Sequence, residues 1–328
     1  MKNNKTKSFL SVIFSWLFII TVACVIGMQM CDANCANLKF AQISDAHYST
    51  FEQDTSFKLL SSSADILDDA ISQVNSTPNI DFTMFTGDMI NKPKETELIS
   101  FISHAKLLNT PWYVVFGNHD TAFGVSLTKS LYFDILNGRN PNFCYKTPYY
   151  SFTPKKGYKV IALDTIIDYK RTSQGEVSEK ELEWLKDELD NSKNDIVIIF
   201  SHVPIVEPYP SESHKLINSY EVRLLLKKYD NPIIVCSGHY HGTKIIQDNN
   251  ILYINTPSLV SYPNAFRIIN VCPQRTKVLV DIYYKETRLK ELQTKAKNKG
   301  IGTALLYGNE EDRTNTFELP KKRDRNSI

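Results

Sequence analysis

The sequence has few of the features that mark unusual protein classes. Its 328 residues include only 6 Cys, 12 Gly and 14 Pro, which excludes a collagen-like chain, a low-complexity chain and a small domain held by disulfides. The formal net charge is only +2, so the composition offers no basic field for nucleic-acid binding. With 42% hydrophobic residues, the chain can fold around a core of its own.

Even this small positive charge belongs to the N-terminal segment. Residues 1–36 contain three lysines and one aspartate, which account for the entire +2. The lysines precede an apolar run from Phe9 to about Met30, a pattern typical of a signal peptide or a retained membrane anchor. We therefore expect an extracytoplasmic protein, either secreted or anchored to the membrane by this segment.

Short apolar runs alternate with helical patterns in the rest of the chain. Five runs of strand length suit strands that are buried on both faces: 38–44, 82–86, 112–116, 196–201 and 233–237. Apolar residues between them recur at helical spacing, and Ser178 with Glu181 forms a capping box before a third helix. A fourth helix, around 215–229, would bury Ile217, Tyr220 and Leu224. This alternation predicts βαβ units in an α/β domain.

The pattern changes after Gly242. Further short strands around the turn-forming triplet 248–250 and beyond predict an antiparallel part that completes the fold. No internal repeat or linker is evident, so we expect one domain over residues 37–300. The residues after it are largely polar and charged, which predicts a loose C-terminal tail over 301–328.

Residues that can carry chemistry follow directly after the five apolar runs. The motifs are Asp45-Ala46-His47, Gly87-Asp88, Gly117-Asn118-His119-Asp120, Ser201-His202 and Gly238-His239-Tyr240-His241. Ligand sites of open α/β sheets form outside the carboxyl ends of the strands, so these endings can converge on one crevice. Five of the seven histidines lie in the motifs, which is the sharpest signal in the sequence.

The same motifs offer more metal ligands than one ion needs. Carboxylate, amide and imidazole donors come from Asp45, Asp88, Asn118, His47, His202, His239 and His241. Two ions that share a carboxylate would use all seven. Mixed nitrogen and oxygen donors without thiolate favour Mn, Fe or Zn over calcium.

In this order and with these separations, the five motifs resemble the calcineurin-like metallophosphoesterase superfamily. Within it the chain looks most like the bacterial class III cyclic-AMP phosphodiesterases, through residues 42–47 (QISDAH), Trp184-Leu185 and 262–267 (YPNAFR). The resemblance covers about residues 38–285. It implies a β-sandwich flanked by helices, in four α/β/β/α layers.

The resemblance also implies a role for each site residue. One metal would be held by Asp45, His47 and His241 and the other by Asn118, His202 and His239, with Asp88 bridging them. His119 and Asp120 would be the catalytic residues, and substrate contacts would come from Asn118, His119 and Tyr240. A metal-bound hydroxide would attack phosphorus while an imidazole serves the leaving oxygen. Asn91 stands where relatives carry an acidic group that orients the histidine.

The function hypothesis is therefore a dinuclear metal-dependent phosphoesterase that hydrolyses a small phosphodiester or phosphomonoester and resembles the cyclic-nucleotide phosphodiesterases. Export favours an alternative, an exported nucleotide, phospholipid or phosphoprotein phosphatase. A remote alternative is a non-catalytic scaffold with the same fold.

Several residues near the motifs have two interpretations. Tyr240 could face substrate or fill the turn between two histidines. The aromatic segment 121–148 could be a specificity lid or a peripheral helix with loops, while the proline-rich segment 203–210 would form a wall of the site. We expect Cys236 to be a core thiol, and His104 and His214 to be ordinary surface residues.

Overall fold

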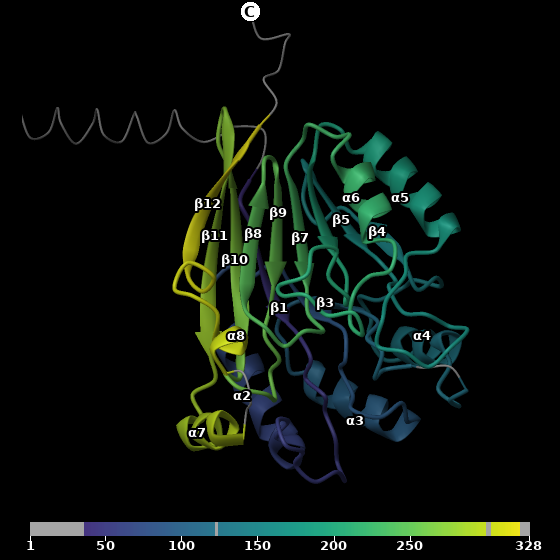
Figure 1. Ribbon diagram of the computed structural model, residues 1–328, viewed down its shortest axis with the longest axis vertical. Helices are drawn as coiled ribbons and strands as arrows, with labels where there is room; N and C mark the ends of the chain where they lie inside the picture. The colour runs from purple at the N-terminus through teal and green to yellow at the C-terminus, as the bar shows by residue number, and fades with distance from the viewer. Residues whose placement is uncertain (1–35, 122–123, 300–302, 322–328) are drawn as a thin grey trace, which may run out of the picture.

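The protein is described by a computed structural model that covers residues 36–121, 124–299 and 303–321. Two six-stranded mixed sheets face each other, with helices outside them (Figure 1). The first sheet has the order β12-β11-β10-β1-β2-β3 and the second β4-β5-β6-β7-β9-β8. The expected β-sandwich with flanking helices is confirmed. The strands are β1 (Leu38–Ile43), β2 (Phe82–Thr86), β3 (Trp112–Val115), β4 (Tyr150–Phe152), β5 (Tyr158–Ala162), β6 (Ile196–Phe200), β7 (Ile233–Ser237), β8 (Lys244–Asp248), β9 (Ile251–Asn255), β10 (Ala265–Pro273), β11 (Lys277–Glu286) and β12 (Asn315–Pro320).

Aromatic side chains join the two sheets at the centre of the core. Phe40 of β1 stacks on Phe82 of β2 with ring centroids 5.2 Å apart, and it meets the ring of Phe200 of β6 edge-on at 5.4 Å. All three side chains are fully buried. Because β1 to β3 and β5 to β7 pair in parallel, their carboxyl ends open toward the same edge of the sandwich.

The helices follow the expected alternation. They are η1 (Leu60–Ser62), α2 (Ser63–Asn75), α3 (Glu95–Ala105), α4 (Lys129–Asn137), α5 (Glu179–Asn191), α6 (Ser219–Leu226), α7 (Lys290–Lys299) and α8 (Thr303–Tyr307). In Figure 1, α5 and α6 lie at the upper right, and α2, α3 and α7 lie at the lower end. Ser178 caps α5, because its hydroxyl accepts the backbone N–H of Glu181 at 3.3 Å. The Glu181 carboxyl instead accepts the backbone N–H of Asp164 at 2.8 Å, so the capping box is only half formed.

The expected buried face of the fourth helix is wrong. Ile217, Tyr220 and Leu224 are exposed, Tyr220 by 68%. The helix begins at Ser219, and it buries Val222 and Leu226, which are four residues apart. Both faces of this helix are apolar, so helical spacing alone could not decide which face meets the core.

The expected loose C-terminal tail is also wrong. β12 pairs with β11 in antiparallel register from Lys277–Pro320 to Ile282–Asn315. Its apolar residues alternate, so that Phe317 is half-buried and Leu319 is fully buried while their neighbours face solvent more openly. An edge strand needs only one such apolar side. Because polar and charged residues surround its two apolar residues, the sequence did not indicate a strand here.

The segment 121–148 is a peripheral helix with loops and not a lid. Its α4 helix places Tyr132 and Phe133 in the core against Phe116, and Phe143 packs on Phe133. Residues 122–123 lie outside the described part. Since these aromatic rings fill the core, they do not face a substrate.

The proposed signal peptide or anchor falls on residues outside the described part of the chain, except for Ala36. Among the described helices, none has the length and apolar character needed to cross a bilayer. Cys236 is a buried core thiol as expected, and Cys144 is exposed.

Candidate metal centre

The backbone at the site is held in an unusual conformation. Five of the seven expected ligands have a positive φ: Asp45 (51°), His47 (37°), Asp88 (51°), His239 (69°) and His241 (54°). Side chains disfavour this left-handed region, at a cost of about 1–3 kcal/mol per residue. Such strain persists only where the surroundings enforce it, and here it gathers at one site.

Two glycines allow the strand ends to approach each other closely. A Cβ on Gly87, whose φ is +86°, would lie 2.2 Å from Nδ1 of His202. A Cβ on Gly117 would lie 2.1 Å from the backbone nitrogen of Asp88. No side chain fits in either place, so both glycines are needed for the ligands to converge.

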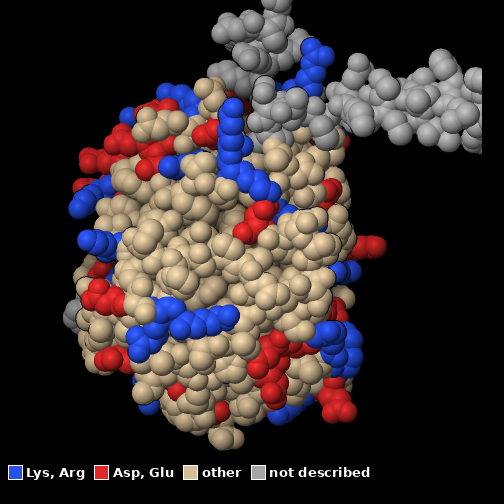
Figure 2. All heavy atoms as spheres, turned by 180° about the vertical axis from the view of Figure 1, so that it is seen from behind, with Lys and Arg blue, Asp and Glu red and all other residues tan. Residues whose placement is uncertain are grey.

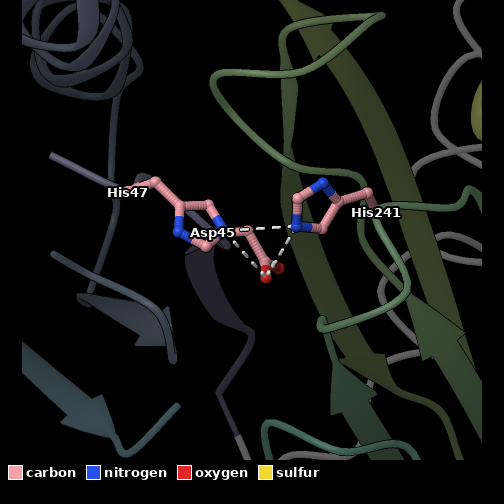
Figure 3. Close-up of side chains that lie close together, drawn as sticks. All are labelled: Asp45, His47 and His241. Atoms are coloured by element: carbon pink, nitrogen blue, oxygen red, sulfur yellow. Dashed lines mark hydrogen bonds and ion pairs between the residues drawn. The ribbon is translucent and has the colours of Figure 1, made fainter. Parts of the chain in front are cut away.

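A first group of donors consists of Asp45, His47 and His241. Nε2 of His47 lies 3.2 Å from Nε2 of His241, which lies 3.4 Å from Oδ1 of Asp45. Figure 3 shows both rings and the carboxylate pointing toward one another from different parts of the chain. The three donor atoms lie within 4.8 Å of one another, a spacing that a single cation can bridge.

A second group lies beside the first. Nε2 of His202 is 3.3 Å from Oδ1 of Asn118 and 3.1 Å from Nδ1 of His239. Asp88 lies between the groups, with Oδ2 at 3.5 Å from Nε2 of His47 and Oδ1 at 3.4 Å from Nε2 of His202. The seven expected ligands thus come together, and one carboxylate faces both groups.

Hydrogen bonds behind two of the imidazoles select the form that binds a metal. His202 donates from Nδ1 to the carbonyl of Thr86 at 2.9 Å, which leaves Nε2 as its lone-pair atom. Nδ1 of His241 lies 3.0 Å from the hydroxyl of Ser261. Such partners fix both the tautomer and the ring orientation of metal-binding histidines.

Charge at the site is concentrated on buried carboxylates. Burial alone would raise the pKa of Asp88, but the adjacent imidazoles of His202 and His119 hold it well below its usual value. Burial tends to lower the pKa of His202, yet Asp88 raises it to about 9. Burial lowers the pKa of His239 to about 3. The centre therefore holds anionic carboxylates that need positive partners.

Two buried polar atoms of the ligand set confirm that the centre suits a cation. Oδ1 of Asp45 and Nε2 of His239 have no hydrogen-bond partner among the described residues. Unpaired buried polar atoms are costly and rare. The Asp45 oxygen faces the first donor group, so the residues present fit a metal there.

His119 is oriented by a backbone carbonyl. Its Nδ1 donates to the carbonyl oxygen of Asn91 at 2.8 Å, and its ring meets that of His47 edge-on at 4.6 Å. Position 91 thus orients the histidine without an acidic side chain. Burial lowers the pKa of His119, although Asp88 opposes this effect.

Asp120 does not have the geometry of a catalytic residue. It is fully buried, and its carboxylate accepts the backbone N–H of Ile90 at 3.0 Å and that of Gly117 at 2.9 Å. It therefore ties the loop after β2 to the loop after β3. Both carboxylate oxygens are used within the protein, a geometry that favours a positioning role over the expected catalytic one.

A cavity of about 320 Å³ opens onto the donor groups. Asp88, Asn118 and His119 line it, and Tyr240 does so too. The Tyr240 hydroxyl donates to Glu207 at 3.0 Å, so the side chain both borders the cavity and is held in place. From the proline-rich segment 203–210, the cavity is lined by Tyr209, whose hydroxyl donates to the carbonyl of Tyr240 at 2.7 Å.

The expectation that His214 is an ordinary surface residue is wrong. It lines the same cavity, and its ring lies 5.2 Å from that of His239. The residue does not follow a strand, so its position in the sequence carried no sign of this. His104 is only partly exposed and pairs with Asp68 at 2.6 Å.

Sequence reasoning also missed Lys58. This lysine is only 6% exposed, lines the cavity, and places Nζ 3.2 Å from Nδ1 of His47. Burial lowers its pKa to about 8. An isolated lysine in a loop has no sequence signature, so only the structure could reveal it.

The surface carries no strong field of one sign on the face seen in Figure 2. Lysine and arginine side chains are interspersed with aspartate and glutamate there, around a broad uncharged centre. This agrees with the small net charge of +2.

A family model described as calcineurin-like phosphoesterase matches residues 38–243. The chain belongs to the calcineurin-like phosphoesterase family. The chain is also similar to a probable glycerophosphodiester phosphodiesterase of Arcobacter nitrofigilis, with 28% identity over 187 residues, 56% of this chain and 65% of the relative. A probable cyclic nucleotide phosphodiesterase of Colwellia psychrerythraea is 27% identical over 187 residues, 55% of this chain and 63% of the relative. The match thus spans just under two-thirds of each relative.

A solved structure has the same fold. A dimetal phosphatase from Danio rerio superposes with a TM-score of 0.59 at 17% identity, covering 74% of this chain and 95% of that protein. At this identity the likeness establishes the fold. Together with the family match, it confirms the resemblance that the five motifs indicated.

Proposed function

We propose that this protein is a dinuclear metal-dependent phosphoesterase. The observation that carries the proposal is the position of Asp88, whose two oxygens face one donor group each, 3.5 Å from His47 and 3.4 Å from His202. Asp45, His47 and His241 would hold one ion, Asn118, His202 and His239 the other. Two bound cations supply an activated water and neutralise charge on the phosphoryl oxygens.

The protein's own residues would orient the substrate and move the proton. His119 donates from Nδ1 to Asn91, so its Nε2 is the atom that can serve the leaving oxygen. Asn118 and Tyr240 line the same cavity and are placed to contact the ester. Asp120 would keep His119 in position through its bonds to the two loops.

We further propose a phosphodiester as the preferred substrate, with Mn, Fe or Zn as the metals. The similarity to relatives named as probable glycerophosphodiester and cyclic nucleotide phosphodiesterases supports this choice. An exported phosphatase is the second candidate, favoured by the N-terminal apolar run from Phe9 to about Met30. That run would also place the enzyme outside the cytoplasm.

Metal-free protein reconstituted separately with Mn, Fe and Zn tests the proposal. Each form is assayed with an aryl phosphodiester, an aryl phosphomonoester, glycerophosphodiesters and cyclic nucleotides. We expect hydrolysis only in reconstituted protein, and faster hydrolysis of diesters. Faster monoester hydrolysis would favour the phosphatase, and equal activity in the chelated protein would rule out both.

A further inference from the structure

Lys58 is a buried cation beside the donor groups that has no carboxylate within ion-pair distance among the described residues. Its Nζ lies 3.2 Å from Nδ1 of His47 and 3.4 Å from Oδ1 of Asn91. The nearby carboxylate of Glu52 is already paired with Lys92 at 2.7 Å and accepts from the Asn91 amide. Among the described residues, Lys58 thus forms no direct ion pair, although the carboxylates of Asp88 and Asp45 lie near enough to act on its charge.

The contact with His47 cannot satisfy Lys58 when the site is loaded. His47 directs Nε2 at the donor groups, so its Nδ1 carries the proton once Nε2 is a ligand. An ammonium can only donate, and a protonated Nδ1 cannot accept. The remaining neutral acceptor, Asn91, offers a single weak contact.

The loop holds Lys58 at the cavity wall. The backbone N–H of Lys58 donates to the hydroxyl of Thr55 at 2.9 Å, and its carbonyl accepts the N–H of Thr55 at 3.0 Å. The side chain lines the cavity together with Asn118 and His119. A buried cation at this position is placed to meet an anion that enters beside the metal ligands.

We propose that Lys58 binds the phosphate group of the substrate and that the amide at position 91 leaves the lysine without a carboxylate partner at that position. This rests on the proposed function and adds a phosphate-binding residue to it, one that acts on both ester classes. A carboxylate at position 91 would pair with Lys58, whereas the Asn91 amide leaves its ammonium free to contact the phosphate. A phosphomonoester dianion gains more from this lysine than a diester monoanion does.

Binding of inorganic phosphate to the metal-loaded protein, measured by calorimetry, tests the role without depending on turnover. Lys58→Met should weaken phosphate binding about tenfold or more, while Lys58→Arg retains most of the affinity. Lys106→Met is the matched control, because Lys106 is exposed at the end of α3 and does not line the cavity; the affinity of this variant should equal that of the wild type. Metal content should stay unchanged in all three variants.

Unchanged phosphate affinity in Lys58→Met with full metal content would overturn the proposal. Loss of bound metal in that variant would also overturn it, because Lys58 would then act on His47. In kinetics, Lys58→Met should lower kcat/KM for an aryl monoester more than for an aryl diester. An equal loss for both esters would contradict the charge argument. If the wild type hydrolyses neither ester, the proposed function fails, and the phosphate titration still decides the role of Lys58.

Asn91→Asp supplies an independent variant. It should weaken phosphate binding more in the wild-type background than in the Lys58→Met background, since only the former has a lysine with which the new carboxylate can pair. Equal losses in both backgrounds would show that position 91 acts by another route and would contradict the proposed link.

Discussion

The strand ends that carry the site, which come from both sheets, differ sharply from the C-terminal strands of the first sheet. At the ends of β1, β2 and β7, ligand residues adopt left-handed backbone, and Asp45 and His239 each bury a polar atom that has no hydrogen-bond partner among the described residues. β10 to β12 instead form regular antiparallel ladders, and β12 alternates its exposure. The protein therefore keeps strain where chemistry is expected and regular pairing where only stability is needed.

The largest effect should follow from removing the carboxylate shared by the two donor groups. Asp88→Asn replaces an anion that faces both His47 and His202. It should reduce the rate of hydrolysis by more than about 100-fold, because mutating residues that merely hydrogen-bond to metal ligands already lowers activity by up to about 100-fold. Initial rates with an aryl phosphodiester measure it. Asp187→Asn, on the exposed side of α5, is the control, and similar rates in both variants would contradict the assignment.

His119→Asn should affect chemistry without affecting metal binding. The variant loses the imidazole that Asn91 orients, so kcat should fall by about 10²–10⁴ while metal content stays at the wild-type value. Steady-state kinetics and elemental analysis of the same sample check both. The His119 ring also lies near His47 and Asp88, so a loss of bound metal would identify it as a ligand instead.

Changes in the C-terminal ladder should lower stability without affecting catalysis or metal binding. Leu319→Ala removes a fully buried side chain of β12 and should lower the free energy of unfolding by about 2–5 kcal/mol. Metal content and kcat should remain unchanged. Leu305→Ala, at an exposed position, is the matched control for chemical denaturation. A stability loss below that of the control would show that β12 adds little to the fold.

The smallest effect is a pH-dependent one at the start of α5. Burial raises the pKa of Glu181 well above its usual 4.5, and Asp164 adds to this shift. The folded state therefore keeps a proton that the unfolded state loses, so the wild type loses stability as pH rises above 4.5. Glu181→Gln still accepts from Asp164 but cannot titrate.

The difference in free energy of unfolding between Glu181→Gln and the wild type should therefore shift in favour of the variant between pH 4 and pH 7, by about 1 kcal/mol. Urea unfolding at the two pH values measures it, with the exposed Glu183→Gln as control. A difference that stays constant with pH would refute the shift.

Sequence patterns revealed the ligands because those residues follow apolar strands directly. The approach failed where the signal is spatial. Lys58 and His214 reach the cavity from loops, and His119 is oriented by a backbone carbonyl that no side-chain pattern encodes. Asp120 was expected to be catalytic from the family resemblance, yet its carboxylate turns inward to Ile90 and Gly117.

The fold shows the same division. Fully apolar runs identified the buried strands, whereas β4 and β5 were missed, and the single apolar side of β12 was hidden among charged residues. The apolar residues of α6 could not indicate which side meets the core. Burial on both faces leaves a clear trace in sequence, while one-sided packing depends on neighbours that only the folded chain supplies.

The most direct test of the account is the number of metal ions bound per chain. Reconstituted wild-type protein, freed of excess metal and measured by elemental analysis, should hold two ions, and Asp88→Asn should hold one or none because the shared carboxylate is lost. Less than one ion per wild-type chain would contradict a dinuclear centre and favour a scaffold. Two ions in Asp88→Asn would contradict the bridging role of Asp88.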